Sequence, residues 1–136
     1  AAKLVHPDRM VVSMNGDGCF MMHGQELATA IQNGANIIAI IINNGLYGTI
    51  RMHQERHYPG RIRNTELINP DFAALAKAYG GHGETVTRTD EFKAAFERAQ
   101  ASGRPAVIEV RIDPNAITST TTLSAIREAS LAKAGR

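Results

Sequence analysis

Two short polar motifs each follow an apolar run. Gly16-Asp17-Gly18 comes after the first run and Asn43-Asn44 after the second, with 24 residues (19–42) between them. Asp17 supplies a carboxylate and Asn44 a carboxamide, and such hard oxygen donors suit Mg²⁺ or Ca²⁺ better than zinc. Glycines let the backbone approach a ligand closely and turn N–H groups toward an anion. Together the motifs predict a magnesium-bridged diphosphate site.

Each motif is also a common turn sequence, so a purely structural role is the alternative for either one. Their positions favour binding, because ligands of open α/β sheets lie outside the carboxyl ends of the strands. One carboxylate is too few for an all-protein cage, so phosphate oxygens and water would complete the magnesium shell. Gly45 and Gly48 follow the second motif and can give the same backbone freedom there.

The elements that position these motifs alternate between strands and helices. Residues 10–14 predict a buried strand, and the β-branched run 37–42 predicts a parallel strand covered on both faces. Between them, residues 24–33 predict a helix that Gly34 ends. Residues 10–43 therefore form one βαβ unit.

The second half of the chain continues this alternation. After Asn44 it predicts an irregular polar stretch, followed by a helix that Asn69 caps, that has Pro70 in its first turn and that Gly80-Gly81 ends. A short strand at Val86 and a helix from near Asp90 to Gly103 come next. A strand over 106–112 and an extension or arm from Thr118 complete the chain. The predicted fold class is α/β: a Rossmann-like, mostly parallel sheet with helices on both faces. We expect one domain over residues 1–115 and a C-terminal extension over 116–136.

Composition excludes several classes of protein. The chain has 136 residues, 43% hydrophobic and 21% charged, with a net charge of +2, as is ordinary for a globular domain. It has no signal-peptide pattern and no apolar run of about 18 residues, so we expect no membrane span. Cys19 is the sole cysteine and has no disulfide partner within the chain. We expect a cytoplasmic location.

The two motifs resemble the thiamin-diphosphate signature of the group that includes acetolactate synthase, benzoylformate decarboxylase and pyruvate decarboxylase. Four further stretches resemble the same group, namely 25–30, 44–48, 69–80 and 104–110. The resemblance covers about residues 3–114. It implies an N-terminally truncated thiamin-diphosphate-binding domain.

The resemblance assigns roles to particular residues. It implies that Mg²⁺ binds the side-chain oxygens of Asp17 and Asn44 and the backbone carbonyl of Leu46. The implied cofactor-binding residues are Gly16, Asp17, Gly18, Cys19, Asn44, Leu46, Tyr47 and Gly48, and the implied substrate-pocket residues are Thr49, Ile50 and His53. Cys19 stands where the group often has serine, and we interpret it as a small loop residue rather than a nucleophile.

The implied reaction is the decarboxylation of a 2-oxo acid such as pyruvate, followed by release of an aldehyde or by formation of a new C–C bond. His53 is a candidate proton donor, and a solvated or structural histidine is the alternative. Met52-His53-Gln54 stands where acetolactate synthases commonly carry Gln-Trp-Gln, whereas Asn44-Gly45-Leu46-Tyr47-Gly48 looks more like benzoylformate decarboxylase.

The resemblance also implies partners. In the group, a glutamate that activates the cofactor lies in an N-terminal domain of the same or a partner subunit. We therefore expect this chain to be the C-terminal part of a larger subunit in a homodimer or homotetramer, with FAD possible elsewhere in that subunit. We expect the 136 residues alone to have no turnover.

The residues offer two alternative functions. A nucleic-acid surface would use the basic patch Arg51, Arg56, Arg61 and Arg63 with His53, His57 and Tyr58, but Glu55 and Glu66 interrupt it, and an active-site flap or subunit contact fits it better. A phosphoacceptor signalling domain would need a lysine after the last strand, where the chain has Asp113-Pro114. We expect no nucleic-acid partner.

Overall fold

The computed structural model describes residues 1–134 and divides into two compact units, Ala1–Asn43 with Asn69–Arg111, and Asn44–Ile68 with Ile112–Arg136. Residues 135 and 136 of the expected C-terminal extension lie outside the described residues. The remainder of that extension belongs to the second unit, together with the segment after the second polar motif.

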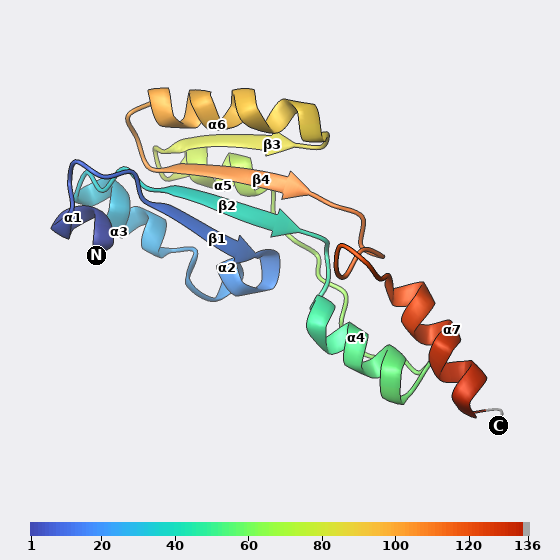
Figure 1. Cartoon of the computed structure of the whole chain (residues 1–136). Coiled ribbons are helices and arrows are strands. Elements are labelled where there is room, and N and C mark those ends of the chain that lie inside the picture. The colour runs from blue at the N-terminus through green and yellow to red at the C-terminus, as the bar shows by residue number, and fades with distance from the viewer. Residues whose placement is uncertain (135–136) are drawn as a thin grey trace. The chain divides into compact units, whose positions relative to one another are not determined.

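The first unit alternates strands and helices along the chain (Figure 1). Its elements are α1 (Ala2–Val5), β1 (Val12–Gly16), α2 (Asp17–His23), α3 (Glu26–Gln32), β2 (Ile38–Asn43), α5 (Phe72–Ala78), β3 (His82–Val86), the 3₁₀ turn η1 (Thr89–Glu91), α6 (Phe92–Ala101) and β4 (Ala106–Arg111). The four strands form one sheet in the order β1-β2-β4-β3, and every neighbouring pair is parallel. The predicted α/β class with a parallel sheet is confirmed.

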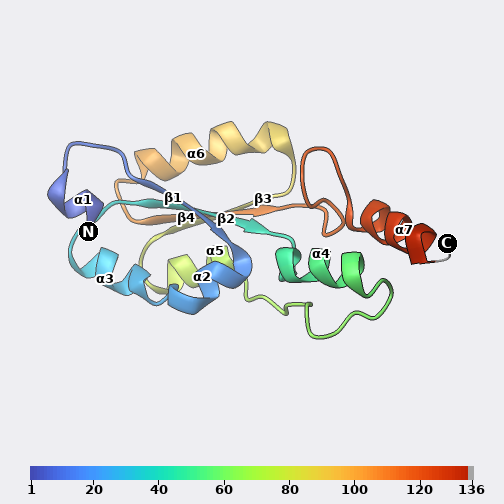
Figure 2. The same cartoon turned by 60° about the horizontal axis from the view of Figure 1, so that its bottom comes forward.

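Alternating side chains of the central strands build two cores. Ile38 and Ile40 of β2 face α6, while Ala39 and Ile41 face the side of α3 and α5. Figure 2 shows α6 on one face of the sheet and α2, α3 and α5 on the other. Helices on both faces are therefore confirmed. Because both faces of β2 are covered, this strand is apolar throughout its buried length.

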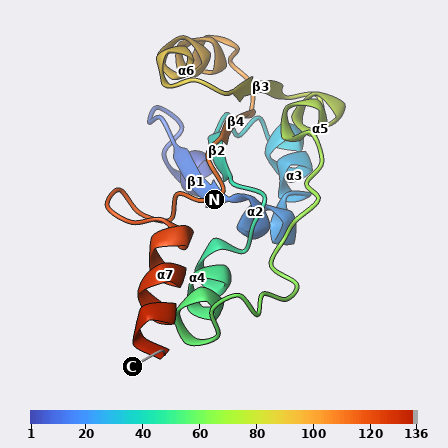
Figure 3. The same ribbon diagram turned by 90° about the vertical axis from the view of Figure 1, so that its right-hand side faces the viewer.

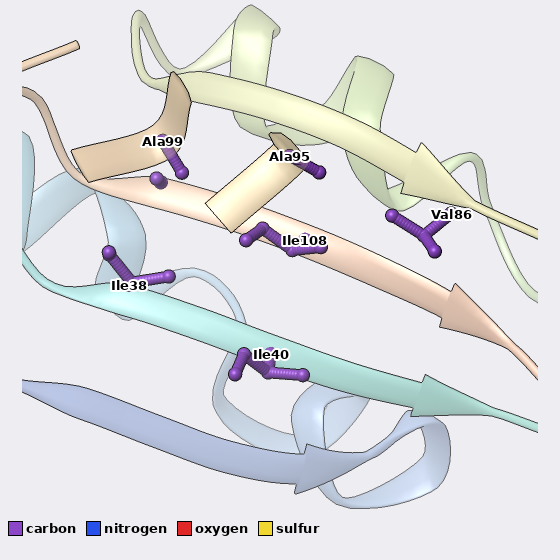
Figure 4. Close-up of a cluster of buried hydrophobic side chains, with 7 residues drawn as sticks. Ile38, Ile40, Val86, Ala95, Ala99 and Ile108 are labelled. Carbon is purple, nitrogen blue, oxygen red and sulfur yellow. The ribbon is translucent and has the colours of Figure 1, made fainter. Parts of the chain in front are cut away.

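The core beneath α6 pairs small helix residues with large strand residues. Ala95 and Ala99 of α6 lie over Ile38, Ile40 and Ile108 (Figure 4). Small side chains let the helix backbone approach the sheet, and each fully buried isoleucine contributes roughly 1.5–3 kcal/mol. Phe92 and Phe96 of α6 pack against this core and are partly buried.

Other predicted elements of this unit are also found. The helix expected over 24–33 is α3, and Gly34 follows it with a φ of +60°. The strands expected at 106–112 and at Val86 are β4 and β3.

The first strand was predicted wrongly in position and burial. It runs over Val12–Gly16 rather than 10–14, and Val12 and Met14 are 41% and 71% exposed. In the order β1-β2-β4-β3 this strand is at the edge and pairs with β2 alone, so its apolar run does not imply burial on both faces.

Two local assignments in this unit were also wrong. Cys19 lies in helix α2 and is exposed, not in a loop, because the helix begins directly at Asp17. Helix α5 begins at Phe72, and its N-cap is Asp71, whose Oδ1 accepts a 2.8 Å hydrogen bond from Ala74 N. Asn69 and Pro70 precede this helix.

The second unit contains two helices that the sequence did not reveal. The stretch predicted to be irregular contains α4 (Gly48–His57), and the expected arm contains α7 (Leu123–Ala134). The two helices lie side by side (Figure 3). Among the helices of residues 1–134, none combines the length and the apolar character needed to cross a membrane.

Candidate functional site

Asp17 lies where the chain leaves β1. It is the first residue of α2 and is only 3% exposed, while Gly16 ends the strand in an extended conformation. Its Oδ1 accepts a 3.0 Å hydrogen bond from Gly18 N. An acidic residue in the first turn of a helix is stabilised by the helix dipole. The carboxylate is thus at the carboxyl end of β1, as the sequence predicted.

A single amide group joins Asp17 to the end of the next strand. Nδ2 of Asn69 lies 2.7 Å from Oδ2 of Asp17 and 2.9 Å from Oδ1 of Asn43, the last residue of β2. Both hydrogens of the amide are therefore used on oxygen acceptors. The side chains at the two strand ends belong to one hydrogen-bonded group.

This group continues to a buried acid in β4. Glu109 is 0% exposed, and its Oε1 accepts a 2.6 Å hydrogen bond from Asn43 Nδ2. Arg111 Nε lies 3.1 Å from the same oxygen, and Thr85 Oγ1 lies 2.8 Å from Oε2. A carboxylate this deeply buried requires such donors to offset the loss of water. The polar group thus extends from Asp17 across three strands.

In the second unit, Asn44 starts a loop with a well-defined backbone. Its Oδ1 accepts a 3.0 Å hydrogen bond from Leu46 N, and Gly45 has a φ of +67°. Leu46 also pairs with Glu66 in an isolated antiparallel bridge. This bridge holds the loop against the segment that follows α4.

Gly48 lies close beside the Asn44 side chain. A Cβ at this position would approach Asn44 Nδ2 to 3.0 Å and Ile117 Cδ1 to 3.2 Å, closer than most such contacts. The same unit contains an open cleft of about 500 Å³. Its lining includes Asn44 and Leu46 of the loop and Leu123 of α7.

The expected pocket residues Thr49, Ile50 and His53 lie on α4 and are exposed. Ile50 is 54% exposed. The ring of His53 stacks on that of His57 one turn later, with a centroid distance of 6.1 Å and an interplanar angle of 6°. A ring so accessible can exchange protons with a ligand or with solvent.

A buried acid in α4 forms an ion pair with one arginine of the predicted basic patch. Glu55 is 0% exposed and pairs with Arg127 of α7 and, at 3.1 Å, with Arg51 Nε. The Arg127 guanidinium is the largest cause that lowers the pKa of Glu55 from 4.5 to about 2. Arg51 is only 14% exposed and also lies 3.4 Å from Thr65 Oγ1. This arginine is therefore an internal partner of Glu55.

The donor set fits a hard divalent cation. Within residues 1–134, no group of three or more His, Cys, Asp or Glu side chains is placed to hold a metal ion by itself. A metal held by Asp17 would thus need neutral oxygens as well, and the amide of Asn44 and the carbonyl of Leu46 are of that kind. Magnesium accepts few protein ligands and completes its shell with phosphate oxygens and water, so donors of this chemistry suit it.

Sequence reasoning missed Asn69, Glu109 and Glu55. Asn69 was interpreted as a helix cap, although the alternative cap Asp71 stands two residues later in the same motif. Glu109 is the one acid inside the apolar run 106–112, and this position was the available signal. Glu55 was counted only as an interruption of a basic patch.

Comparison with known proteins matches residues 1–110 to the family model described as the thiamine pyrophosphate enzyme, C-terminal TPP binding domain. A probable acetolactate synthase of Mycobacterium bovis is 37% identical over 115 residues, covering 85% of this chain and 21% of that protein. A 3D-(3,5/4)-trihydroxycyclohexane-1,2-dione hydrolase of Bacillus subtilis is 35% identical over 122 residues, covering 85% of this chain and 19% of that protein.

A solved structure agrees with these relatives. The thiamine diphosphate-dependent 4-hydroxybenzoylformate decarboxylase of Rhodococcus jostii RHA1 superposes with a TM-score of 0.76 at 35% identity, covering 82% of this chain and 21% of that one. The chain spans about a fifth of the length of the relatives it matches. With its parallel sheet and the family match over residues 1–110, this chain belongs to the thiamine pyrophosphate enzymes, as their C-terminal, cofactor-binding domain.

Proposed function

We propose that the chain binds Mg²⁺ and the diphosphate of thiamin diphosphate within a larger subunit that decarboxylates or ligates 2-oxo acids. Asp17, Asn44 and the Leu46 carbonyl are the metal ligands. The observation that carries this proposal is the buried Asp17 carboxylate at the end of β1, oriented by hydrogen bonds from Asn69 and Gly18. A buried, oriented carboxylate is well suited to a hard cation.

The remaining residues near the two motifs contact the cofactor and the substrate. Gly16, Gly18, Cys19, Tyr47 and Gly48 contact the cofactor. Thr49, Ile50 and His53, on the exposed surface of α4, line the substrate pocket, where the His53 ring holds a proton for the product. Bound thiamin diphosphate supplies the nucleophilic carbon and the electron sink that loss of CO₂ requires.

Two substrate classes follow from the relatives. Similarity to the probable acetolactate synthase favours pyruvate as the substrate of this subunit and carboligation as its reaction. The decarboxylase from Rhodococcus favours an aromatic 2-oxo acid and simple decarboxylation. Incubating the intact subunit with pyruvate alone and with benzoylformate alone separates them, because acetolactate forms in the first case and benzaldehyde in the second.

The chain acts together with other parts of its subunit. We propose that an N-terminal domain of the same or a partner subunit completes the site in a homodimer or homotetramer, and that any FAD binds outside this chain. The 136 residues alone are then inactive. Turnover of a 2-oxo acid by this chain alone would show that the completing domain is unnecessary.

Titration calorimetry of the intact subunit with thiamin diphosphate, at rising Mg²⁺ concentrations and in EDTA, tests the binding proposal. Asp17→Ala and Asn44→Ala are expected to lose Mg²⁺-dependent binding. Asp71→Ala is the matched control, since it removes an N-cap carboxylate, at a cost of about 1 kcal/mol of stability, and leaves the ligands in place. Magnesium-independent binding by the unaltered subunit, or unchanged binding by Asp17→Ala, contradicts the proposal.

A further inference from the structure

We infer that Asn69 is a positioning residue that orients the Asp17 carboxylate for the metal. The inference rests on the proposed function, because it gives a role to a residue that is not itself a ligand. Asn69 lies outside the two polar motifs, and its side chain is half-buried in the first unit.

The hydrogen bonds of Asn69 leave no choice in how its amide is turned. Both partners of its Nδ2 are oxygen atoms, Oδ2 of Asp17 at 2.7 Å and Oδ1 of Asn43 at 2.9 Å. A carboxylate only accepts hydrogen bonds, so the NH₂ side of Asn69 has to face Asp17. An amide turned the other way would place oxygen against oxygen.

The far end of the group fixes the second amide in the same manner. Asn43 donates through Nδ2 to the buried carboxylate of Glu109 at 2.6 Å. Its Oδ1 must then face Asn69, which it does. Asn69 therefore donates both to Asp17 and to Asn43, and Asn43 donates on to Glu109, so the hydrogen bonds run outward from Asn69 to two buried acids. Neither amide can turn without breaking two hydrogen bonds.

For Asp17 the consequence is a defined carboxylate plane. Gly18 N donates to Oδ1 and Asn69 Nδ2 donates to Oδ2, so each oxygen has a fixed neutral donor. These two donors hold the plane of the carboxylate in a defined orientation. Partners of this kind behind a ligand commonly change metal affinity by about 10- to 100-fold when removed.

The role differs from that of a structural cap. Asp71, not Asn69, accepts the hydrogen bond of the first turn of α5. Removal of the Asn69 amide therefore leaves the cap of this helix in place. Its main effect is expected on the metal and not on the helix.

The test measures the Mg²⁺ concentration at which Mg²⁺ binding to the intact subunit is half-saturated. The measurement is made at saturating thiamin diphosphate and below the melting temperature of every variant. Asn69→Ala is expected to raise the half-saturating Mg²⁺ concentration by about tenfold or more, with kcat restored at excess Mg²⁺. Asn69→Ser, which keeps a polar group in the site, is expected to show the same shift and serves if the alanine variant does not fold.

The matched control is Asn33→Ala in the same unit. The amide of Asn33 donates at 2.8 Å to the Thr29 carbonyl near the end of α3, so its loss affects stability alone. The inference is overturned if both Asn69 variants have a half-saturating Mg²⁺ concentration within twofold of that of the unaltered subunit. Lack of Mg²⁺-dependent binding by the unaltered subunit instead rejects the proposed function, and this inference with it.

Discussion

Arg127 of α7 donates through Nε to Oε2 of Glu55 in α4 at 2.8 Å, joining two residues 72 positions apart in the sequence. Glu55 is fully buried, whereas the Arg127 side chain is 38% exposed. A buried carboxylate is tolerated only where donors replace its water, and Gly60 N at 3.4 Å adds to the arginines. This pair is a polar link between the two helices of the second unit.

The first prediction concerns the loss of folding stability at acidic pH. The pKa of Glu55 is lowered from 4.5 to about 2, first by the Arg127 hydrogen bond, so the folded state favours the charged form. The stabilisation is complete above pH 4.5, where the unfolded chain is also ionised, and is lost as the pH falls toward 2. The shift corresponds to roughly 3 kcal/mol. Chemical denaturation between pH 6 and 2.5 should show a smaller acid loss in Glu55→Gln than in the unaltered protein.

Removal of the arginine separates this explanation from general acid instability. Arg127→Ala leaves Glu55 buried with a weaker set of donors and is expected to cost about 3–5 kcal/mol at pH 7. Arg56→Ala, on the exposed side of α4, is the control and should cost under about 0.5 kcal/mol. Equal losses for the two variants would contradict the role given to the pair.

The second prediction concerns Gly48. Gly48→Ala would bring a Cβ to within 3.0 Å of Asn44 Nδ2, so the carboxamide has to move. Because Asn44 is a proposed metal ligand, the half-saturating Mg²⁺ concentration should rise by about tenfold. Gly34→Ala is the control, since its φ of +60° produces strain of about 1 kcal/mol without any crowding. Equal Mg²⁺ dependence in both variants would argue against Asn44 as a ligand.

The extent to which sequence predicts this fold depends on where the stabilising contacts lie. Helix α3 was found because Leu27 and Ala30 repeat on its buried face, and β2 because its run is apolar on both faces. Helix α4 has no comparable apolar stripe, and its buried residue is Glu55. An ion pair with a residue 72 positions away leaves no local periodicity, so this helix was missed.

The same distinction applies to the site. The position of Asp17 after a strand could be predicted, because strand ends are marked by local residues. The role of Asn69 depends on Asp17, 52 positions earlier, and a local pattern equally suits a helix cap. Glu109 was hidden in a strand because two of its donors, Asn43 and Thr85, come from two other strands.

The third prediction concerns His53, which is exposed and stacks on His57. If His53 holds the proton delivered to product, His53→Ala in the intact subunit should lower kcat by about 10²-fold or more and change the ratio of aldehyde to ligated product, with Mg²⁺ dependence unchanged. His57→Ala removes the stacking partner and is the control. An unaltered rate and product ratio in His53→Ala would remove this residue from the mechanism.

We propose that Asp17, Asn44 and the Leu46 carbonyl hold one divalent cation against the cofactor diphosphate. A crystal structure of the intact subunit with Mn²⁺ and thiamin diphosphate tests it most directly, because the anomalous signal of manganese locates the metal. A single metal peak bonded to all three protein oxygens and to the diphosphate is the expected result. A diphosphate-bound metal that touches neither Asp17 nor Asn44 would contradict it.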